Sequence, residues 1–268
     1  ELSTLDLRCD PGLRLYTGKT QNVARLALKL ESLDPGQPVS LELDGQKLEK
    51  VAWPSSGQLT LQRQGDAWQV AEPASPALKG PRRYGPFREA FGNRVMLVYG
   101  TRGSAEENAW SYARARLDAE TFWVRGNGSV DLIADTALDP RKDPDRSVIL
   151  YGSAETNGAW APLLGGSPVQ VTRGLVKVGA KGFRGQDLAC LFLRPRPGSD
   201  TACVAAVSGS GLPGLRLTDR MAYFTAGITY PDCIVLGPEV LSQGPQGVRA
   251  AGYFAQDWSV PTGDWVWQ

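Results

Sequence analysis

The sequence has 268 residues, with 29 Lys and Arg, 28 Asp and Glu, and no histidine. The absence of histidine excludes a Ser-His-Asp or Cys-His nucleophile system, and a His-containing zinc site, built from this chain alone. A formal net charge of +1 gives no general attraction to nucleic acid, and no apolar run approaches the roughly 18–20 residues of a membrane span. Catalysis by carboxylates, Lys, Tyr or a bound cofactor stays open.

Residues 1–75 carry the pattern of a small β module. Val39, Leu41 and Leu43 alternate with polar residues, which is the period of a half-buried strand. Asp44-Gly45 and Gly65-Asp66 are typical of hairpin turns. We predict an antiparallel β-sandwich with strands at residues 13–18, 23–31, 39–48, 59–65 and 67–72. The segment 23–31 also fits a short helix, and strand is the preferred interpretation.

A Pro- and Gly-rich stretch follows and is predicted to be a linker over residues 76–86. From residue 87 to 268, apolar strand-like runs alternate with helical patterns, which indicates a Rossmann-like α/β domain with a mainly parallel sheet. Ser104 and Glu107 form a capping-box pattern, so we expect a helix to begin there and to end at Gly126–Gly128. Further helices are expected at 156–164 and 215–227, a hairpin at 169–179, and strands at 94–100, 129–135, 147–152, 188–195, 203–209, 233–237 and 248–254.

Two segments of this domain repeat one pattern, at residues 94–110 and 146–160. Each has an apolar strand ending in Tyr-Gly, then a small hydroxyl residue, an Asn and a Trp. The repetition fits a structural βα unit used twice. It also fits a ligand site, because the carboxyl ends of adjacent parallel strands form the usual crevice of an α/β sheet. The residues that this second interpretation places near a ligand are Thr101, Arg102, Ser104, Ser153, Asn157 and Ser210.

A glycine-rich turn at Gly209-Ser-Gly-Leu-Pro-Gly214 matches the pattern of a dinucleotide-binding loop. That pattern also needs an acidic residue at the end of the next strand, and Asp232 precedes the strand instead. A turn that opens a helix is therefore the preferred interpretation. A nucleophile elbow has glycine two residues before and two residues after the serine, and neither Ser208 nor Ser210 has this spacing.

The chain also offers aromatic and cysteine residues that could carry function. Trp258, Trp265 and Trp267 suit an aromatic platform for a sugar or a partner, and they equally fit a tail folded back onto the domain. The cysteines at 9, 190, 203 and 233 form no C-x-x-C pair, so no metal site is predicted. The last three sit in apolar runs typical of buried hydrophobic residues, and a disulfide between Cys190 and Cys203 requires adjoining strands. No cofactor is predicted.

Several long segments resemble the C-terminal region of bacterial, planctomycete-type serine hydrolases of the prolyl oligopeptidase family. They include RYGPFREAF, NRVMLVYGT, ARARLDAETFWVRGNGSV, DRSVILYGSAETNGAW, DLACLFLRPRPGSD and LTDRMAYFTAGITYPDCIVLGPEVL. The resemblance implies a catalytic α/β-hydrolase domain that lies upstream of this region, and no position here matches its nucleophile, acid or histidine motifs. It also implies a periplasmic or secreted parent protein. The start at Glu1, without Met or a signal peptide, is expected of a processed chain or an excised fragment.

The leading hypothesis is a noncatalytic accessory region of a larger serine hydrolase, which serves substrate positioning, binding or oligomerisation. Its expected partners are the upstream hydrolase domain and, as an alternative, further copies of itself, with no nucleic acid and no membrane span. The rival hypothesis is a free-standing ligand-binding or enzymatic α/β domain with its site at the carboxyl ends of the strands. A third is a carbohydrate-binding module that uses the three C-terminal tryptophans.

Overall fold

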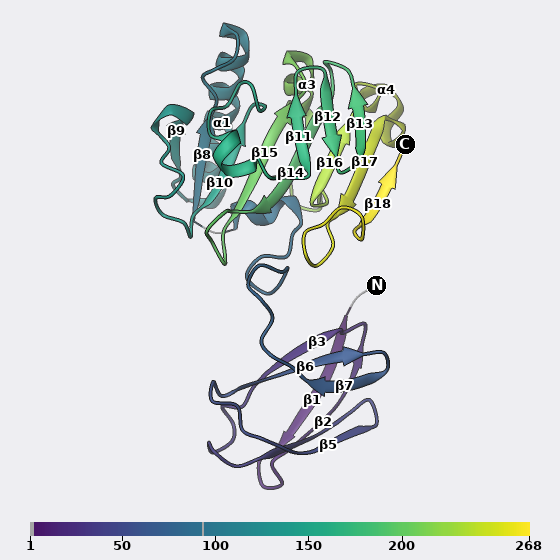
Figure 1. Cartoon of the computed structure of the whole chain (residues 1–268). Coiled ribbons are helices and arrows are strands. Elements are labelled where there is room, and N and C mark those ends of the chain that lie inside the picture. The colour runs from purple at the N-terminus through teal and green to yellow at the C-terminus, as the bar shows by residue number, and fades with distance from the viewer. Residues whose placement is uncertain (1–2, 93) are drawn as a thin grey trace. The chain divides into compact units, whose positions relative to one another are not determined.

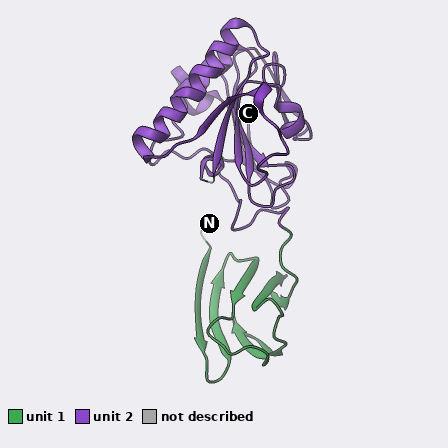
Figure 2. Cartoon of the chain, turned by 90° about the vertical axis from the view of Figure 1, so that its left-hand side faces the viewer, with its two compact units in different colours: residues 1–75 green, residues 76–268 purple. Residues whose placement is uncertain are grey.

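The computed structural model describes residues 3–92 and 94–268, and its contacts divide the chain into two compact units. Unit 1 spans residues 1–75 and unit 2 spans residues 76–268 (Figure 2). Strands predominate over helices, and the chain has a mixed α/β architecture with several sheets (Figure 1). Within the described residues, no helix has both the length and the apolar character that crossing a membrane requires.

Unit 1 consists of two sheets that share one buried core. The four-stranded sheet has the order β1-β2-β4-β5 and the three-stranded sheet the order β3-β6-β7. Both sheets contribute to the core, with Leu41 and Leu43 from the first and Leu28, Leu61 and Trp68 from the second. The strands are β1 (Thr4–Asp10), β2 (Leu15–Gln21), β3 (Arg25–Lys29), β4 (Val39–Leu43), β5 (Gln46–Val51), β6 (Gln58–Gln64) and β7 (Ala67–Val70).

The strand pattern of unit 1 differs from the sequence prediction in three respects, the first being that the predicted strand 39–48 divides into β4 and β5 at the Asp44-Gly45 turn. The segment that fitted either helix or strand forms β3, whose Leu26 and Leu28 point into the core. Strand β1 was not predicted, because its residues are mostly exposed and show little apolar alternation. Strands β2 and β4 pair in parallel, so the expected all-antiparallel module contains one parallel pairing.

Unit 2 is built on an eight-stranded sheet with the order β18-β17-β16-β14-β15-β10-β8-β9. The strands β9, β8, β10 and β15 run parallel to one another, whereas β15 and β14, β14 and β16, β16 and β17, and β17 and β18 pair antiparallel. The sheet is therefore mixed, and the expectation of a mainly parallel sheet was wrong for half of it. The strands are β8 (Val95–Tyr99), β9 (Asp131–Ala134), β10 (Ser147–Tyr151), β14 (Ala189–Pro195), β15 (Cys203–Gly209), β16 (Cys233–Leu236), β17 (Val248–Tyr253) and β18 (Asp264–Trp267).

Further elements cover the two faces of this sheet. The long helix α1 (Ala105–Gly126) and the short helix α3 (Leu212–Leu217) lie on one face (Figures 1 and 2). On the other face lies a small antiparallel sheet of β11 (Val169–Thr172), β12 (Leu175–Val178) and β13 (Lys181–Arg184). Helices α2 (Trp160–Leu164) and α4 (Val240–Gln243) and four short 3-10 segments (Phe87–Phe91, Asp135–Ala137, Thr218–Arg220 and Gly244–Gly247) complete the described part of the unit.

Residues 76–86, expected as a linker, pack into unit 2. The guanidinium of Arg83 is buried and donates hydrogen bonds to the carbonyl oxygens of Ser199 (2.6 Å) and Pro76 (2.7 Å). A cluster of Phe87, Phe91 and Tyr223 continues this anchoring, with ring centroids 5.5–5.9 Å apart. The segment after residue 75 therefore belongs structurally to the second unit.

The expected helix at 215–227 is much shorter in the structure. Helix α3 ends at Leu217, a 3-10 turn covers Thr218–Arg220, and Met221 is already extended. Tyr223 and Phe224 pack instead against Phe91 in the aromatic cluster. Burial of these two rings outweighs the helical periodicity of the segment, since local propensity is a weak preference that tertiary packing overrides.

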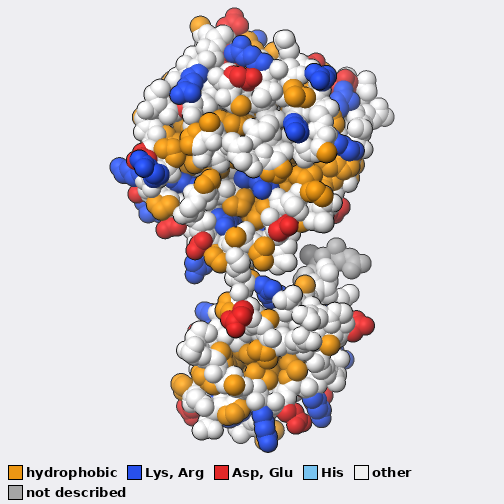
Figure 3. Space-filling model, in the orientation of Figure 1, with side chains coloured by type: hydrophobic (Ala, Val, Ile, Leu, Met, Phe, Trp, Pro, Cys, Tyr) orange, Lys and Arg blue, Asp and Glu red, His pale blue; other side chains and the backbone are white. Residues whose placement is uncertain are grey.

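The surface carries charges of both signs. On the face drawn in Figure 3, Lys and Arg side chains are interspersed with Asp and Glu side chains. This mixture agrees with the formal net charge of +1 for the whole sequence.

Candidate functional site

The strand order places a reversal of chain direction across the sheet at β8. After β8 the chain crosses through α1 to β9 on one side, and it then returns to β10 on the other side of β8. Such a reversal is the position at which open α/β sheets usually bind ligands, at the carboxyl ends of the strands. The loops after β8 and β10 meet here.

Close backbone packing brings these two loops together. A Cβ atom on Gly100 would lie 2.3 Å from the carbonyl oxygen of Thr156, so the first loop can approach the second only with glycine at this position. Gly152 has a φ of 118°, a conformation that side-chain-bearing residues rarely adopt. The amide of Arg102 also donates a hydrogen bond to the carbonyl of Thr156 (3.0 Å). The Tyr-Gly repeat is thus explained by two tight turns that pack on each other.

Asp135 joins the ends of three strands at this edge. It follows β9 directly, is 6% exposed, and accepts hydrogen bonds from the hydroxyl (2.6 Å) and the amide (3.2 Å) of Thr101. The same carboxylate accepts the amide of Gly158, after β10, at 2.5 Å. No role was predicted for Asp135 from the sequence. An acidic residue directly after a predicted strand was the signal that could have identified it.

The two asparagines of the repeat hydrogen-bond to backbone groups of the strand ends and loops. Asn157 is buried, and its side-chain nitrogen donates to the carbonyls of Val98 and Tyr151, both at 3.0 Å. Asn108 accepts the amide of Gly103 (2.8 Å) and donates to the carbonyl of Thr101 (3.0 Å). Each asparagine therefore fixes the backbone of a strand end or of the loop after it.

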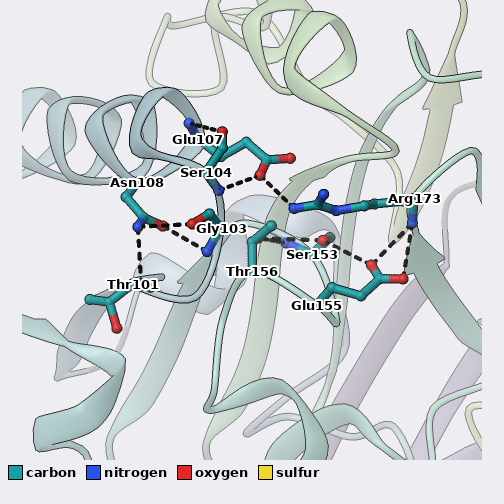
Figure 4. Close-up of polar contacts among 9 residues, drawn as sticks. All are labelled: Thr101, Gly103, Ser104, Glu107, Asn108, Ser153, Glu155, Thr156 and Arg173. Carbon is teal, nitrogen blue, oxygen red and sulfur yellow. Dashed lines mark hydrogen bonds and ion pairs between the residues drawn. The ribbon is translucent and has the colours of Figure 1, made fainter.

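Arg173, on the turn between β11 and β12, connects both loops (Figure 4). Its guanidinium pairs with the buried carboxylate of Glu107 on α1 at 2.6 Å. Its backbone amide donates to the carboxylate of Glu155 at 3.0 and 3.2 Å. Glu155 also accepts a 3.4 Å hydrogen bond from the buried hydroxyl of Ser153. No pattern in the sequence associates Arg173 with this edge, since it lies 66 residues from Glu107.

Ser104 and Arg102 are exposed residues of the loop between β8 and α1. Ser104 is the N-cap of α1, its hydroxyl accepts the amide of Glu107 (3.2 Å), and Glu107 accepts the amide of Ser104 (2.8 Å). The predicted capping box is confirmed. The guanidinium of Arg102 is exposed and packs over Gly158, where a Cβ atom would lie 2.7 Å from it.

Ser210 lies apart from these loops, at the end of β15. Its buried hydroxyl donates to the carbonyl of Gly185 (2.6 Å) and accepts the amide of Leu188 (3.2 Å). The glycines around it are required by packing, because a Cβ on Gly214 would lie 2.2 Å from the carbonyl of Leu188. The glycine-rich turn thus presses the start of α3 against the segment before β14.

The C-terminal tryptophans do not form one exposed surface. Trp258 is 2% exposed, within the hydrophobic core of unit 2. Trp265 and Trp267 on β18 are half-buried and stacked on each other, with ring centroids 4.9 Å apart, and the ammonium of Lys181 lies 4.5 Å from the centroid of Trp267. The structure thus brings together two of the three proposed platform residues.

The four cysteines are free thiols in the described structure. Strands β14 and β15 are adjacent, but Cys190 pairs with Ser208 and Cys203 with Pro195, so the two cysteines occupy opposite ends of the ladder. Burial raises the pKa of Cys203 to about 12 and raises that of Cys233 well above its ordinary value. These thiols therefore stay protonated at neutral pH and pack as hydrophobic residues.

A cleft of about 1010 Å³ opens at the opposite end of the sheet, beside the amino ends of β10 and β15. Its charged lining includes Arg82, Arg88, Arg94, Glu89, Asp145 and Asp200. Glu89 accepts hydrogen bonds from the amides of Tyr84 (2.7 Å) and Gly85, and burial raises its pKa. Sequence reasoning assigned part of this lining to a linker. The run of arginines beside Tyr84 was the signal that it overlooked.

These groups define what the unit can do chemically. The buried hydroxyls at the carboxyl edge donate to protein carbonyl and carboxylate groups, and the cleft at the amino ends offers charges of both signs to a polar ligand. Among the described residues, no group of three or more Cys, Asp and Glu residues is placed to hold a metal ion. No protein-family model and no curated protein matches the chain.

Proposed function

We propose that this chain is a noncatalytic accessory region of a larger serine hydrolase of the prolyl oligopeptidase family, serving substrate positioning, binding or oligomerisation. The observation that carries the proposal is the hydrogen bonding of Ser210, a serine at the carboxyl end of β15. The hydroxyl of Ser210 is buried and donates its proton to a main-chain carbonyl 2.6 Å away, in a sequence that contains no histidine. A serine nucleophile needs an adjacent general base, and a carbonyl oxygen is none.

Ser153 supports the same proposal. Its hydroxyl is buried between the hydroxyl of Thr156 (3.3 Å) and the carboxylate of Glu155 (3.4 Å). Both contacts are long for hydroxyl hydrogen bonds, and Glu155 also accepts the amide of Arg173. The carboxylate is thereby directed toward holding the turn between β11 and β12.

The finer fold assignment and the cellular setting belong to this proposal. We infer a Rossmann-like relationship for the parallel half of the sheet, β9-β8-β10-β15, with α1 as the crossover helix. The resemblance to the hydrolase family supports an upstream hydrolase domain as the partner and a periplasmic or secreted location. The antiparallel half, β14-β16-β17-β18, lies outside that relationship.

Activity assays test the proposal directly. The purified chain is incubated with p-nitrophenyl esters, with peptide substrates and with a fluorophosphonate probe that labels reactive serines. We expect no turnover above background and no labelling. Turnover that a single substitution, Ser153→Ala or Ser210→Ala, abolishes while the fold is retained would overturn the proposal. The gene sequence upstream of Glu1 tests the partner, since it should encode a domain with the G-x-S-x-G elbow.

A second candidate function is small-ligand binding at the carboxyl edge. The observation that favours it is the reversal of strand order at β8, which gathers Thr101, Arg102 and Ser153 at the usual ligand position. It predicts a saturable ligand whose binding is lost in Arg102→Ala, on the exposed rim, and kept in Arg141→Ala, on an exposed loop elsewhere in unit 2.

A further inference from the structure

Helix α1 presents apolar side chains on both of its faces. Toward the sheet it buries Trp110, Ala115 and Asp118. On the outer side of unit 2 (Figure 2) it exposes large hydrophobic residues. The exposed fractions are 45% for Tyr112, 52% for Leu117, 70% for Trp123 and 80% for Val124. Exposed apolar side chains gathered on one helix mark an interaction site more often than single residues scattered over a surface do.

The two halves of the outer face of α1 differ in the size of their side chains. The first half carries the small Ala109 and Ala113 beside Tyr112, and the last turns carry the more exposed Trp123 and Val124. Between them lies an exposed ion pair, in which Arg116 contacts Glu120 at 2.7 Å. Along the helix, Arg116 and Glu120 are placed symmetrically before and after the level of Asp118, whose own side chain is buried on the opposite side of α1.

A hollow adjoins the half with the small residues. It has a volume of about 630 Å³ and lies beside Ala109 and Ala113, with Arg216, Asp219 and Arg220 on its far side. The most exposed bulky side chains therefore stand at one end of the outer face, and free space adjoins the small residues at the other end. Such a surface is complementary to a copy of itself turned end to end.

We propose that a second copy of this chain docks on this face, with the two α1 helices antiparallel about a twofold axis that passes between Arg116 and Glu120. The axis brings Arg116 of each copy to Glu120 of the other, and it brings the end with Trp123 and Val124 to Tyr112, Ala113 and the hollow. A contact of this kind is isologous, so the same patch serves both subunits and the assembly closes as a dimer. Opposite charges at the centre fix the antiparallel register.

The dimer gives a partner and a surface to the oligomerisation role named under the proposed function. It rests on that proposal only for its biological meaning, since the association is measured without any enzymatic assay. A chain that turns over esters and still dimerises would overturn the function alone. A chain that is inactive and monomeric would overturn the dimer alone.

Sedimentation equilibrium and light scattering of the full chain, from about 1 µM upward, test the dimer. We expect concentration-dependent dimers for the wild type. Arg116→Glu and Glu120→Arg each place like charges at the centre, and each should weaken association by about tenfold or more. The two variants mixed in equal amounts restore both opposite-charge contacts, so the mixture should dimerise again.

Controls separate this contact from general effects on the fold. The swapped double variant Arg116→Glu/Glu120→Arg should dimerise, and Trp123→Ala should weaken association. Arg141→Glu, at an exposed position on a loop, should leave it unchanged. Circular dichroism should show intact helix throughout, since an exposed ion pair adds little stability. A wild type that stays monomeric at all concentrations, or a mixture of the two single variants that fails to associate, would overturn the proposal.

Discussion

Asp118 is the buried charge on which the packing of α1 against the sheet depends. It is 1% exposed and accepts hydrogen bonds from the hydroxyls of Tyr151 (2.7 Å) and Tyr223. Arg114, one turn earlier, lies 3.4 Å away and also donates to the hydroxyl of Tyr223 (3.1 Å). Burial raises the pKa of Asp118, and the charge of Arg114 opposes that shift. The two tyrosines and the arginine together solvate a carboxylate that water does not reach.

Replacing Asp118 with Asn should cost about 3 kcal/mol of unfolding free energy. The amide keeps an acceptor for the tyrosine hydroxyls, but among the residues described it leaves the buried Arg114 with the 3.6 Å contact to Asp219 as its one ion pair. Asp219→Asn is the matched control, because its half-exposed side chain should cost under about 1 kcal/mol. Urea unfolding followed by near-ultraviolet circular dichroism measures both. Equal losses in the two variants would contradict this account.

At the residue scale, the position of the candidate site was easier to predict than the hydrogen-bond partners of its residues. Thr101, Arg102, Ser104, Ser153 and Asn157 follow two strands of one sheet and lie at one edge, whereas Ser210, which the same hypothesis placed with them, lies apart at the end of β15. Their hydrogen bonds run to carbonyls and carboxylates supplied by other elements, and that information depends on the full fold. Ligand binding by these residues stays a prediction.

At the scale of elements, α1 shows how capping chemistry fixes the start of a helix. Ser104 and Glu107 satisfy each other's backbone amides, and Asn127 closes the helix with a left-handed φ of 47°. Glu107 at the same time holds Arg173 from the small sheet. The helix start therefore belongs both to α1 and to the network at the carboxyl edge.

Ser104→Ala should destabilise the protein by about 1 kcal/mol, because the amide of Glu107 loses its acceptor. Ser104→Thr retains a hydroxyl and should cost less. Urea unfolding gives the global effect, and hydrogen exchange of the first-turn amides shows whether the loss is local to the helix start. If Thr and Ala cost the same, the hydroxyl does not cap α1.

Elements with strong local signals were predictable, and those that depend on distant partners were not. The run before Gly100 and the capping box of α1 carry their own signals, and both elements formed as expected. Strand β18 was missed, because the segment DWVW is short and acquires its pairing from β17. The expected helix at 156–164 is reduced to α2, since the buried Asn157 holds the preceding residues in a turn.

On the scale of the whole molecule, each unit encloses its own hydrophobic core. The core of unit 1 includes Leu41 and Trp68, and that of unit 2 includes Leu150 and Phe192. The change of pattern between alternating strands and continuous apolar runs indicated two modules. It did not indicate which runs pair antiparallel, because a buried strand is apolar on both faces in either direction. Half of the large sheet was mispredicted for this reason.

Separate cores should give separable unfolding. Leu41→Ala in unit 1 and Leu150→Ala in unit 2 each empty a position that is at most 1% exposed, and each should cost about 2–5 kcal/mol in its own unit. Among the described residues, Leu41 packs only in the core of unit 1 and Leu150 only in the core of unit 2. A substitution in one core should therefore leave the other core intact. Hydrogen exchange read by mass spectrometry measures this, since Leu41→Ala should speed exchange in residues 3–75 and leave β10 and β15 protected, with the reverse for Leu150→Ala. Loss of protection in both units from either substitution would mean that the two cores fold as one cooperative body.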